Sequence, residues 1–144
     1  MSRRESGFTL IEIIVVVVII GILATLIAPQ ILGRVDEARV TAARQDIQTL
    51  GTALDFYRMD NFRYPTTDQG LEALVMKPDD PTVRNWRPDG YLKARSVPKD
   101  PWGNEYRYLQ PGSHGGGYDL YSLGSDGETG GEGADADIGS WNLE

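Results

Sequence analysis

The side chains best suited to chemistry lie in one acidic, glycine-rich stretch, LGSDGETGGEGADADIGSWN (residues 123–142). Its carboxylates at Asp126, Asp135 and Asp137 are hard oxygen ligands. Its glycines allow sharp backbone turns, which can direct carbonyl oxygens inward as well. A mixture of carboxylate and carbonyl oxygens suits Ca²⁺, which takes about six to eight oxygen ligands, better than Zn²⁺. The stretch therefore indicates a calcium site.

The spacing within this stretch excludes one well-known calcium motif and leaves one alternative. A glycine follows Asp126 directly, and no glutamate closes a loop of EF-hand length, so the stretch is not an EF-hand. A flexible, solvated acidic tail is the alternative. Ile138 and Trp141 near the end of the stretch favour instead a loop that is pinned to a core.

Little else in the sequence suggests catalysis. The single histidine, His114, lies in the flexible turn QPGSHGGG, where we expect a solvated side chain. The patterns of a nucleophile elbow, a zinc protease and a P-loop are missing from the sequence. The chain has no cysteine and a formal net charge of −7, which disfavours thiolate metal sites and nucleic-acid binding. We therefore expect a protein that is not an enzyme.

Glu12 is the one charged residue in the apolar run of residues 8–28, whose other polar residues are Thr9 and Thr25. A helix of this length spans roughly 30 Å, the thickness of the apolar part of a bilayer. A secretory signal peptide fits less well, because the run is long and no A-x-A cleavage site follows it. We predict a membrane-spanning helix. A carboxylate within such a helix is usually functional and needs a partner.

The charges in front of this run predict its orientation. Arg3 and Arg4 precede it, so the positive-inside rule places the N-terminus in the cytoplasm and the rest of the chain on the other side of the membrane.

After Pro29 the apolar residues become periodic and predict that the helix continues to about Asp60. Spacings of three and four residues place one apolar stripe on a single helix face: Val40, Ala43, Ile47, Leu50, Leu54 and Tyr57. Pro29 removes a helical hydrogen bond, and two nearby glycines, Gly21 and Gly33, weaken the helix further. We therefore expect a kink or a locally unwound stretch near residues 21–33.

The remaining chain predicts a small sheet and a short helix. Residues 105–109 and 118–124 alternate and are rich in tyrosine, which predicts two antiparallel strands. In the proline-rich segment before them we predict one short strand near Tyr91. The segment TTDQGLEALV predicts a short helix with Thr66, Thr67 or Asp68 as its N-cap. The aromatic residues of this part should pack on the amphipathic helix: Trp86, Tyr91, Trp102, Tyr106, Tyr108, Tyr118, Tyr121 and Trp141. The fold class is α+β.

Several motifs resemble those of a known family. SGFTLIEIIVVVVIIGILA resembles the class III signal of type IV pilins and pseudopilins. The segments ALDFYRMDNFRYPTTDQGLEAL, DGYLK, DPWGNEYRYLQPG and YDLYSLGSDGETGGEGADADIGSWN are similar to those of the major pseudopilins of type II secretion systems. Type IV pilins usually end in a disulfide loop, which the lack of cysteine disfavours.

The resemblance implies a type IV pilin-like fold with three segments. Residues 1–7 would be a leader that a prepilin peptidase removes, cutting between Gly7 and Phe8 and methylating the new amine of Phe8. Residues 8–28 would form a transmembrane and filament-core helix. Residues 29–144 would form a periplasmic domain that includes the amphipathic helix 29–60.

The resemblance also implies a role and partners. The subunit would sit in the bacterial inner membrane and assemble with its own copies into a periplasmic filament, the pseudopilus. The pseudopilus would help to drive folded exoproteins through the outer membrane. The implied partners are minor pseudopilins, an inner-membrane assembly platform and its ATPase. Calcium would bind the C-terminal loop through the carboxylates of Asp126 and Asp137, the carbonyl of Leu123, and Asp135.

Glu12 gains a partner under this resemblance. Cleavage after Gly7 would create an ammonium group on Phe8, four residues before Glu12. In a filament, Glu12 would meet the Phe8 amine of a neighbouring subunit, and an unpaired carboxylate in an apolar core is strongly penalised. Two other functions stay open at this point: a type IV pilin or minor pseudopilin, and a membrane-anchored calcium-dependent enzyme.

Overall fold

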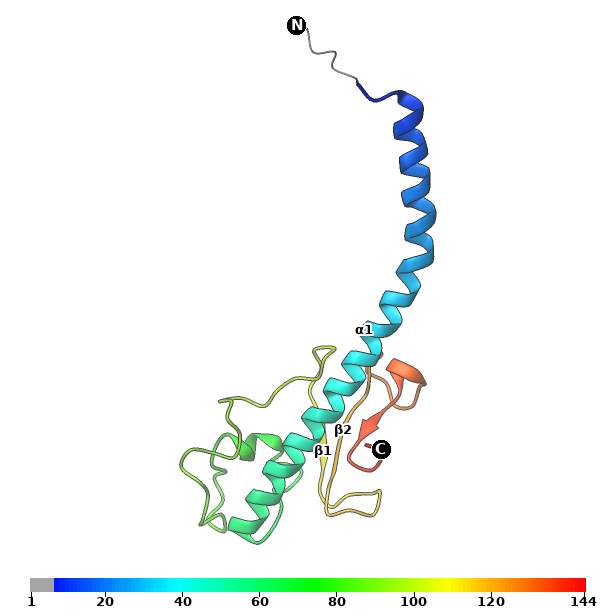
Figure 1. The fold of residues 1–144 in the computed structure, drawn as a ribbon. Coiled ribbons are helices and arrows are strands. Elements are labelled where there is room, and N and C mark those ends of the chain that lie inside the picture. Colours follow the sequence, from blue (N-terminus) through cyan, green and yellow to red (C-terminus); the bar gives the residue numbers. More distant parts are fainter. Residues whose placement is uncertain (1–6) are drawn as a thin grey trace, which may run out of the picture. The chain divides into compact units, whose positions relative to one another are not determined.

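The structure, a computed structural model, describes residues 7–144 (Figure 1). Its elements are α1 (Leu10–Asn61), the 3₁₀ helix η1 (Leu71–Leu74), β1 (Arg107–Leu109), β2 (Asp119–Ser122), the 3₁₀ helix η2 (Gly133–Asp135) and β3 (Ile138–Gly139). The predicted fold class, a long N-terminal helix with a small antiparallel sheet, is confirmed. The chain divides into two compact units, one that ends at Asp36 and one that runs from Glu37 to Glu144.

The first half of α1 buries none of its apolar side chains. Every large apolar residue from Leu10 to Val35 is exposed, by fractions between 41% and 79%. This segment is long and apolar enough to cross a membrane. Of the two expected outcomes near residues 21–33, the unwound stretch is absent, because the helix runs through Pro29 without a break, and the kink stays a prediction. Proline removes only its own N–H donor, and the bonds of the neighbouring turns keep the helix intact.

The second half of α1 carries the core of the second unit. The predicted apolar stripe is confirmed: Val40 is half-buried, and Ala43, Ile47, Leu50, Leu54 and Tyr57 are buried. The helix ends at Asn61, close to the predicted end, and the next residue, Phe62, adopts a left-handed conformation with φ 63°. The stripe thus fixes which face of the helix receives the rest of the chain.

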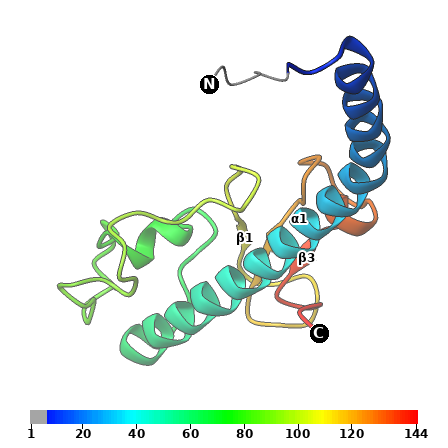
Figure 2. The same ribbon diagram turned by 45° about the horizontal axis from the view of Figure 1, so that its top comes forward.

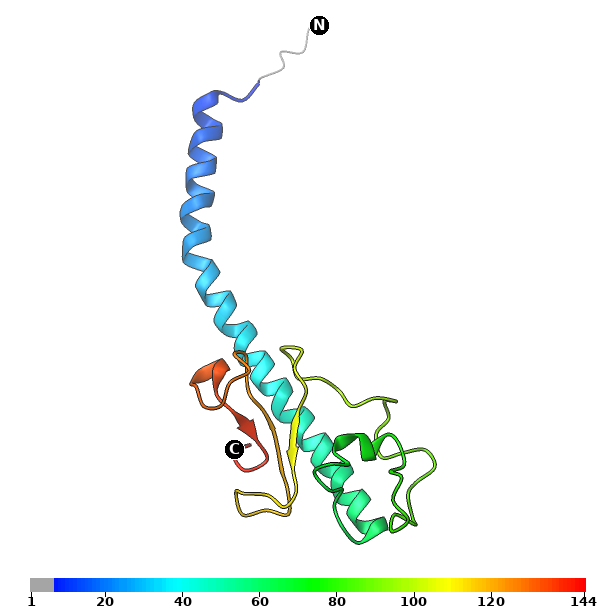
Figure 3. The same cartoon turned by 180° about the vertical axis from the view of Figure 1, so that it is seen from behind.

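The three strands form one antiparallel sheet in the order β1-β2-β3. Figures 1 and 3 show this sheet alongside the second half of α1. Both predicted strands are confirmed, although each is shorter than expected. The predicted strand near Tyr91 is wrong, because residues 91–96 form bends and the Tyr91 hydroxyl bonds to Asn61 and Asp60 instead. In register, Tyr108 pairs with Leu120 and Ser122 pairs with Ile138.

Most of the predicted aromatic residues do pack on the core. Tyr106 is buried, and five others pack against the same core: Trp86, Tyr91, Trp102, Tyr108 and Tyr118. The Tyr106 hydroxyl donates to Asp46 of α1 over 2.8 Å, and burial raises the pKa of Tyr106. Tyr121 and Trp141 depart from the prediction, because they contact each other, with 5.5 Å between ring centroids.

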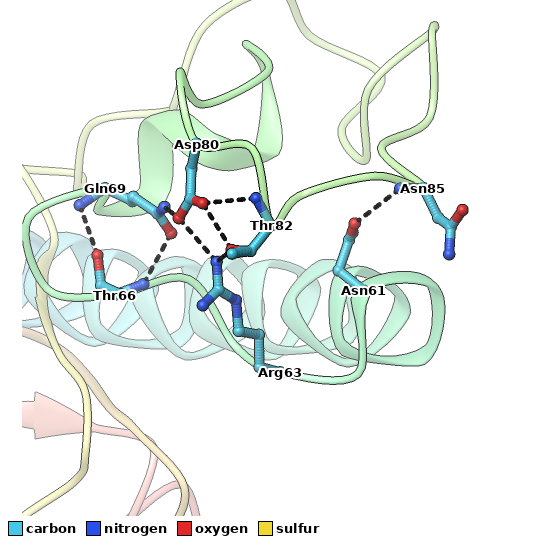
Figure 4. A network of polar contacts seen from close by, with 7 residues as sticks. All are labelled: Asn61, Arg63, Thr66, Gln69, Asp80, Thr82 and Asn85. Carbon is cyan, nitrogen blue, oxygen red and sulfur yellow. Dashed lines mark hydrogen bonds and ion pairs between the residues drawn. The ribbon is translucent and has the colours of Figure 1, made fainter.

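A polar network holds the segment after α1 in place (Figure 4). The Asp80 carboxylate accepts hydrogen bonds from Thr82, from Arg63 at 2.7 Å and from Gln69 at 2.9 Å. Hydrogen bonds from Thr82, followed by the interactions with Arg63, lower the pKa of Asp80 to about 2. Thr66 and Gln69 exchange two hydrogen bonds, so Thr66 caps the turn that precedes η1. The predicted N-cap of the helix itself, at Thr66, Thr67 or Asp68, is wrong, because η1 begins after Gly70 without a side-chain cap.

The two connecting regions of the second unit lie at different turns of α1. Figure 2 shows the segment between α1 and β1 near the C-terminal end of the helix, and the C-terminal segment beside its earlier turns. The acidic stretch belongs to the C-terminal segment. It begins directly after β2 and includes η2 and β3.

Candidate functional site

Glu12 lies in the first turn of α1 and forms a reciprocal pair with Thr9. The Thr9 backbone N–H donates to Glu12 Oε2 over 2.7 Å, and the Glu12 N–H donates to Thr9 Oγ1 over 3.3 Å. This pair is a capping box, which satisfies two donors at the start of a helix. Glu12 therefore has a partner within its own turn. The T-x-x-E spacing is visible in the sequence, and the sequence interpretation missed it.

Gly7 and Phe8 precede the helix in an irregular segment. Both are exposed, and a Cβ on Gly7 would meet nothing within 4 Å. This segment is thus accessible in the structure. The rest of the predicted leader, including Arg3 and Arg4, lies outside the described residues.

The predicted calcium ligands occupy different positions in the acidic stretch. Leu123 directly follows β2 and is half-buried, and Asp137 directly precedes β3. Asp126 and Asp135 are exposed. Within residues 7–144, no three acidic or histidine side chains lie together closely enough to hold a metal ion. The stretch brings the ligand segments into one loop but does not gather all three carboxylates.

The loop is organised by its own hydrogen bonds. The Ser125 N–H donates to the Ala134 carbonyl over 2.9 Å, and the Ser125 hydroxyl donates to Asp135 Oδ1. The Gly130 N–H donates to Asp137 Oδ2 over 3.1 Å. A third carboxylate, that of Asp126, accepts the N–H two residues further on over 3.0 Å. Each of these hydrogen bonds uses one oxygen of an aspartate carboxylate and leaves the second oxygen available to bind a cation.

Two glycines permit the close packing of this loop. A Cβ on Gly124 would lie 2.7 Å from the Ala134 carbonyl oxygen, and one on Gly131 would lie 2.5 Å from that of Asp135. Both glycines have positive φ, 71° and 83°, which other residues rarely adopt. The backbone at residues 134–135 is therefore held against the start of the loop.

Asp137 has an oxygen that the protein itself leaves unsatisfied. Its Oδ1 is buried and has no hydrogen-bond partner among the described residues. A buried acceptor without a partner costs about 1–3 kcal/mol. The potential metal ligands around the loop are carboxylate and carbonyl oxygens, which suit a hard cation. The residues present therefore fit Ca²⁺, even though the three carboxylates do not converge.

His114 is exposed, as predicted, with 47% of its side-chain surface accessible, but the side chain also has defined contacts. Its Nδ1 lies 2.8 Å from Asp119 Oδ2, and its ring stacks on that of Trp141 with 3.7 Å between centroids. The Ser113 hydroxyl also donates to Asp119, over 2.7 Å. This is not the geometry of a nucleophile and its base. Ser113 and His114 both bond to Asp119, and the His114 nitrogen that faces Asp119, Nδ1, is also the nitrogen that lies near the Ser113 hydroxyl. The cluster fixes the turn to the C-terminal segment.

Asp119 is buried beneath this turn. Burial by itself would raise the pKa of its carboxyl group. Hydrogen bonds from Ser113 and His114 outweigh burial and lower the pKa to about 2. Asp119 therefore accepts these bonds as a carboxylate over the ordinary pH range.

Two protein families match this chain, and together they cover nearly all of it. Residues 2–28 match the family described as "Prokaryotic N-terminal methylation motif". Residues 30–141 match the family described as "Type II secretion system (T2SS), protein G". The boundary between the two matches falls at Pro29.

Characterised relatives agree with these matches. The chain is 60% identical over 141 residues to a protein of Pseudomonas aeruginosa named "Type II secretion system core protein G", and 97% of each chain is covered. It is 55% identical to the protein of the same name from Vibrio cholerae, with 99% of this chain and 95% of the relative covered. The fold is similar to the crystal structure of the major pseudopilin from enterohaemorrhagic Escherichia coli. That similarity has a TM-score of 0.65 and 45% identity, and it covers 76% of this chain and 92% of the other.

Proposed function

This chain belongs to the type II secretion system protein G family, the major pseudopilins, and from that membership we propose that it builds a helical periplasmic filament that helps to drive folded exoproteins through the outer membrane. The protein is a structural pseudopilin and not an enzyme. Type IV pilins and minor pseudopilins are thereby set aside, because both the family match and the close relatives are G proteins.

The observation that carries the proposal is the first half of α1. Its large apolar side chains from Leu10 to Val35 are all exposed. Exposed apolar surface of this extent is unstable in water and calls for lipid or other apolar helices. A bilayer covers these side chains before assembly, and the same segments of neighbouring subunits cover them in the filament core.

Maturation precedes assembly in this proposal. Prepilin peptidase cuts between Gly7 and Phe8 and methylates the Phe8 amine. The match of residues 2–28 to the N-terminal methylation motif supports this step, and so does the exposed, irregular backbone at Gly7. The mature chain then consists of the transmembrane segment 8–28 and the periplasmic domain 29–144.

Glu12 acts in assembly through its charge. Its carboxylate pairs with the Phe8 ammonium of a neighbouring subunit and so favours the correct axial register, since an unpaired charge in an apolar core is costly. The capping box with Thr9 uses Oε2 of this carboxylate. The other oxygen remains available for the neighbour, so cap and intersubunit pair are compatible.

The acidic loop binds Ca²⁺ through the carboxylates of Asp126, Asp135 and Asp137 and the carbonyl of Leu123. The unsatisfied Oδ1 of Asp137 supports this assignment. A bound Ca²⁺ neutralises acidic charge and ties the loop to the domain. Because it binds only the folded loop, it stabilises the periplasmic domain.

The remaining assignments follow from family membership. The subunit is inserted in the bacterial inner membrane with its N-terminus in the cytoplasm. It assembles on an inner-membrane platform with its ATPase, and minor pseudopilins occupy the tip of the filament.

The test uses the full chain, expressed with prepilin peptidase and an assembly system. The mass of the membrane-extracted protein should show loss of residues 1–7 and the gain of one methyl group. Gly7→Ala should remain uncleaved. Glu12→Val should be cleaved and inserted, but filaments should be lost in electron micrographs, because the carboxylate no longer pairs with the amine.

Glu12→Gln is the matched variant for the role of Glu12. Glutamine serves in a capping box as glutamate does, so this change keeps the bonds to Thr9 and removes only the charge. We expect it to impair filaments as strongly as Glu12→Val. Normal filaments from Glu12→Gln would show that capping, and not charge pairing, is what Glu12 contributes. A mature-sized product from Gly7→Ala would refute the cleavage site.

A further inference from the structure

Asp100 is a buried acidic residue in the turn PKDPWGN, which precedes β1. Its Oδ1 accepts two backbone N–H groups, from Trp102 at 3.1 Å and from Asn104 at 2.8 Å. These bonds close the turn and fix the orientation of the carboxyl group. The second oxygen, Oδ2, is directed to the end of β2.

Ser122 connects this carboxyl group to the acidic loop. Its side chain is fully buried at the last position of β2, and its hydroxyl donates to Asp100 Oδ2 over 2.7 Å. The same hydroxyl oxygen accepts the Gly124 N–H over 3.1 Å. Two buried hydrogen bonds thus link the turn at Asp100 to the first peptide groups of the loop.

The second of these bonds sets the direction of the Leu123 carbonyl. The Gly124 N–H and the Leu123 C=O belong to one planar peptide group, in which they point in opposite directions. Because the N–H faces the Ser122 hydroxyl, the carbonyl must face away from it. Gly124 also packs closely against the backbone at residues 134–135, where a Cβ would lie 2.7 Å from the Ala134 carbonyl oxygen.

Ser122 also lies beside the other end of the loop. It pairs with Ile138 across β2 and β3, and Ile138 directly follows Asp137. The serine therefore lies between two of the proposed ligands, one residue before Leu123 and across the sheet from the neighbour of Asp137.

We propose that Asp100 and Ser122 are positioning residues of the cation site, which hold the Leu123 carbonyl in the direction that a bound Ca²⁺ requires. The inference rests on the proposed calcium site and adds a part of the chain that lies outside the acidic stretch. Groups that orient metal ligands typically contribute about 10- to 100-fold in affinity. The turn around Asp100 and the loop should accordingly respond together to calcium.

The test is a calcium titration of the full chain in detergent micelles, after treatment with chelator. Ser122→Ala removes the hydroxyl, releases the 123–124 peptide and should weaken Ca²⁺ binding about 10-fold or more. Ser140→Ala is the matched control. The Ser140 hydroxyl accepts the N–H of Leu120 in the same strand over 3.2 Å instead of the N–H of Gly124, so its loss should leave the affinity within about two-fold of the wild type.

A second readout separates positioning from general stability. Both serine variants should lower the thermal midpoint in chelator, since each leaves a backbone N–H of β2 or the loop without its acceptor. Only Ser122→Ala should also reduce the rise in midpoint that calcium produces. Amide hydrogen exchange should show loss of protection at Gly124 in Ser122→Ala and retained protection in Ser140→Ala.

Asp100→Asn provides an independent variant if Ser122→Ala fails to fold. The amide keeps an oxygen for the turn but removes the acceptor of the Ser122 hydroxyl, so binding should weaken by a smaller factor than in Ser122→Ala, yet by more than in Ser140→Ala. Wild-type affinity in Ser122→Ala, or in Asp100→Asn if Ser122→Ala fails to fold, would overturn the inference and leave the calcium site standing. A wild-type chain that does not bind calcium would overturn the site itself.

Discussion

The two halves of α1 share one helix and differ in everything around it. The first half, up to Asp36, exposes every large apolar side chain from Leu10 to Val35, and residues 13–24 are apolar on all sides. The second half carries one apolar stripe, which is buried under the sheet and its connections. Helix propensity therefore does not separate the halves. The pattern of apolar residues does, because a stripe suits one partner surface and an all-round apolar helix suits lipid or a bundle of helices.

Two leucines make the comparison direct. Leu26 is 63% exposed and Leu54 is 0% exposed, although both lie in the same helix. The side chain is identical, so the difference in environment alone determines how much each residue contributes to stability. Leu26 can gain packing contacts only from other molecules, whereas Leu54 gains them from its own chain.

The largest effect is expected from truncating these two leucines in turn. Leu54→Ala should lower the free energy of unfolding of residues 37–144 by about 2–5 kcal/mol, because it removes a buried side chain and leaves a cavity. Leu26→Ala should leave this free energy unchanged. Urea denaturation of the full chain in detergent, followed by tyrosine and tryptophan fluorescence, measures both.

The Leu26→Ala variant can also contradict this distinction between the two halves of α1. Leu26→Ala should act on filament assembly, since its side chain gains contacts only from other molecules. A fall in the stability of the second unit by more than about 0.5 kcal/mol in Leu26→Ala would mean that the first half supports the domain in the isolated subunit.

The features that the sequence predicted well are those that depend on periodicity. The stripe from Val40 to Tyr57 and the two tyrosine-rich strands follow from spacings of three to four and of two residues. The strand near Tyr91 failed because its β-prone residues serve side-chain contacts, among them the bond from Tyr91 to Asp60. β3 was missed because its two residues are too few to show a period.

The candidate sites show a similar limit. Residue type and composition were enough to single out the acidic stretch and Glu12. The Thr9 partner of Glu12 follows a readable local motif and could have been found. The link from Asp100 to Ser122 could not, because 22 residues separate the two in sequence and only the fold brings them together. The bond between His114 and Asp119 could not be predicted either, because it depends on the geometry of a glycine-rich turn.

Calcium removal should sharpen the contrast between the two halves of α1. The acidic loop belongs to the unit of residues 37–144, so chelation should lower the thermal midpoint of that unit and leave the helicity of the first half unchanged. At free Ca²⁺ about 100 times the dissociation constant, the loss corresponds to about 2.7 kcal/mol. Calorimetry and circular dichroism of the full chain in detergent, with and without chelator, measure the two effects.

Asp137→Asn is the control for this effect. This substitution removes the charge of the side chain whose Oδ1 lacks a partner, so the thermal midpoint of the variant should respond little to calcium. An unchanged wild-type midpoint in excess chelator would count against the site. A response in Asp137→Asn as large as in the wild type would remove Asp137 from the proposed ligand set.

Acid should reveal a smaller contribution, again confined to the second unit. The pKa of Asp119 falls from the ordinary value of 3.8 to about 2 on folding. A lowered pKa means that the unfolded chain takes up the proton first, so the stabilisation is complete above about pH 4 and is lost as the pH falls toward 2. The shift corresponds to about 2 kcal/mol.

Asp119→Asn isolates this contribution from the other carboxyl groups that titrate in acid. The difference in unfolding free energy between wild type and variant should be largest above pH 4 and should shrink as the pH approaches 2. Asp80 has a similarly lowered pKa but a side chain that is 25% exposed, so Asp80→Asn should show a weaker version of the same trend, because solvent screens its partners. A constant difference between wild type and Asp119→Asn from pH 5 to pH 2 would mean that packing of the His114 turn, and not the charge of Asp119, stabilises this end of the domain.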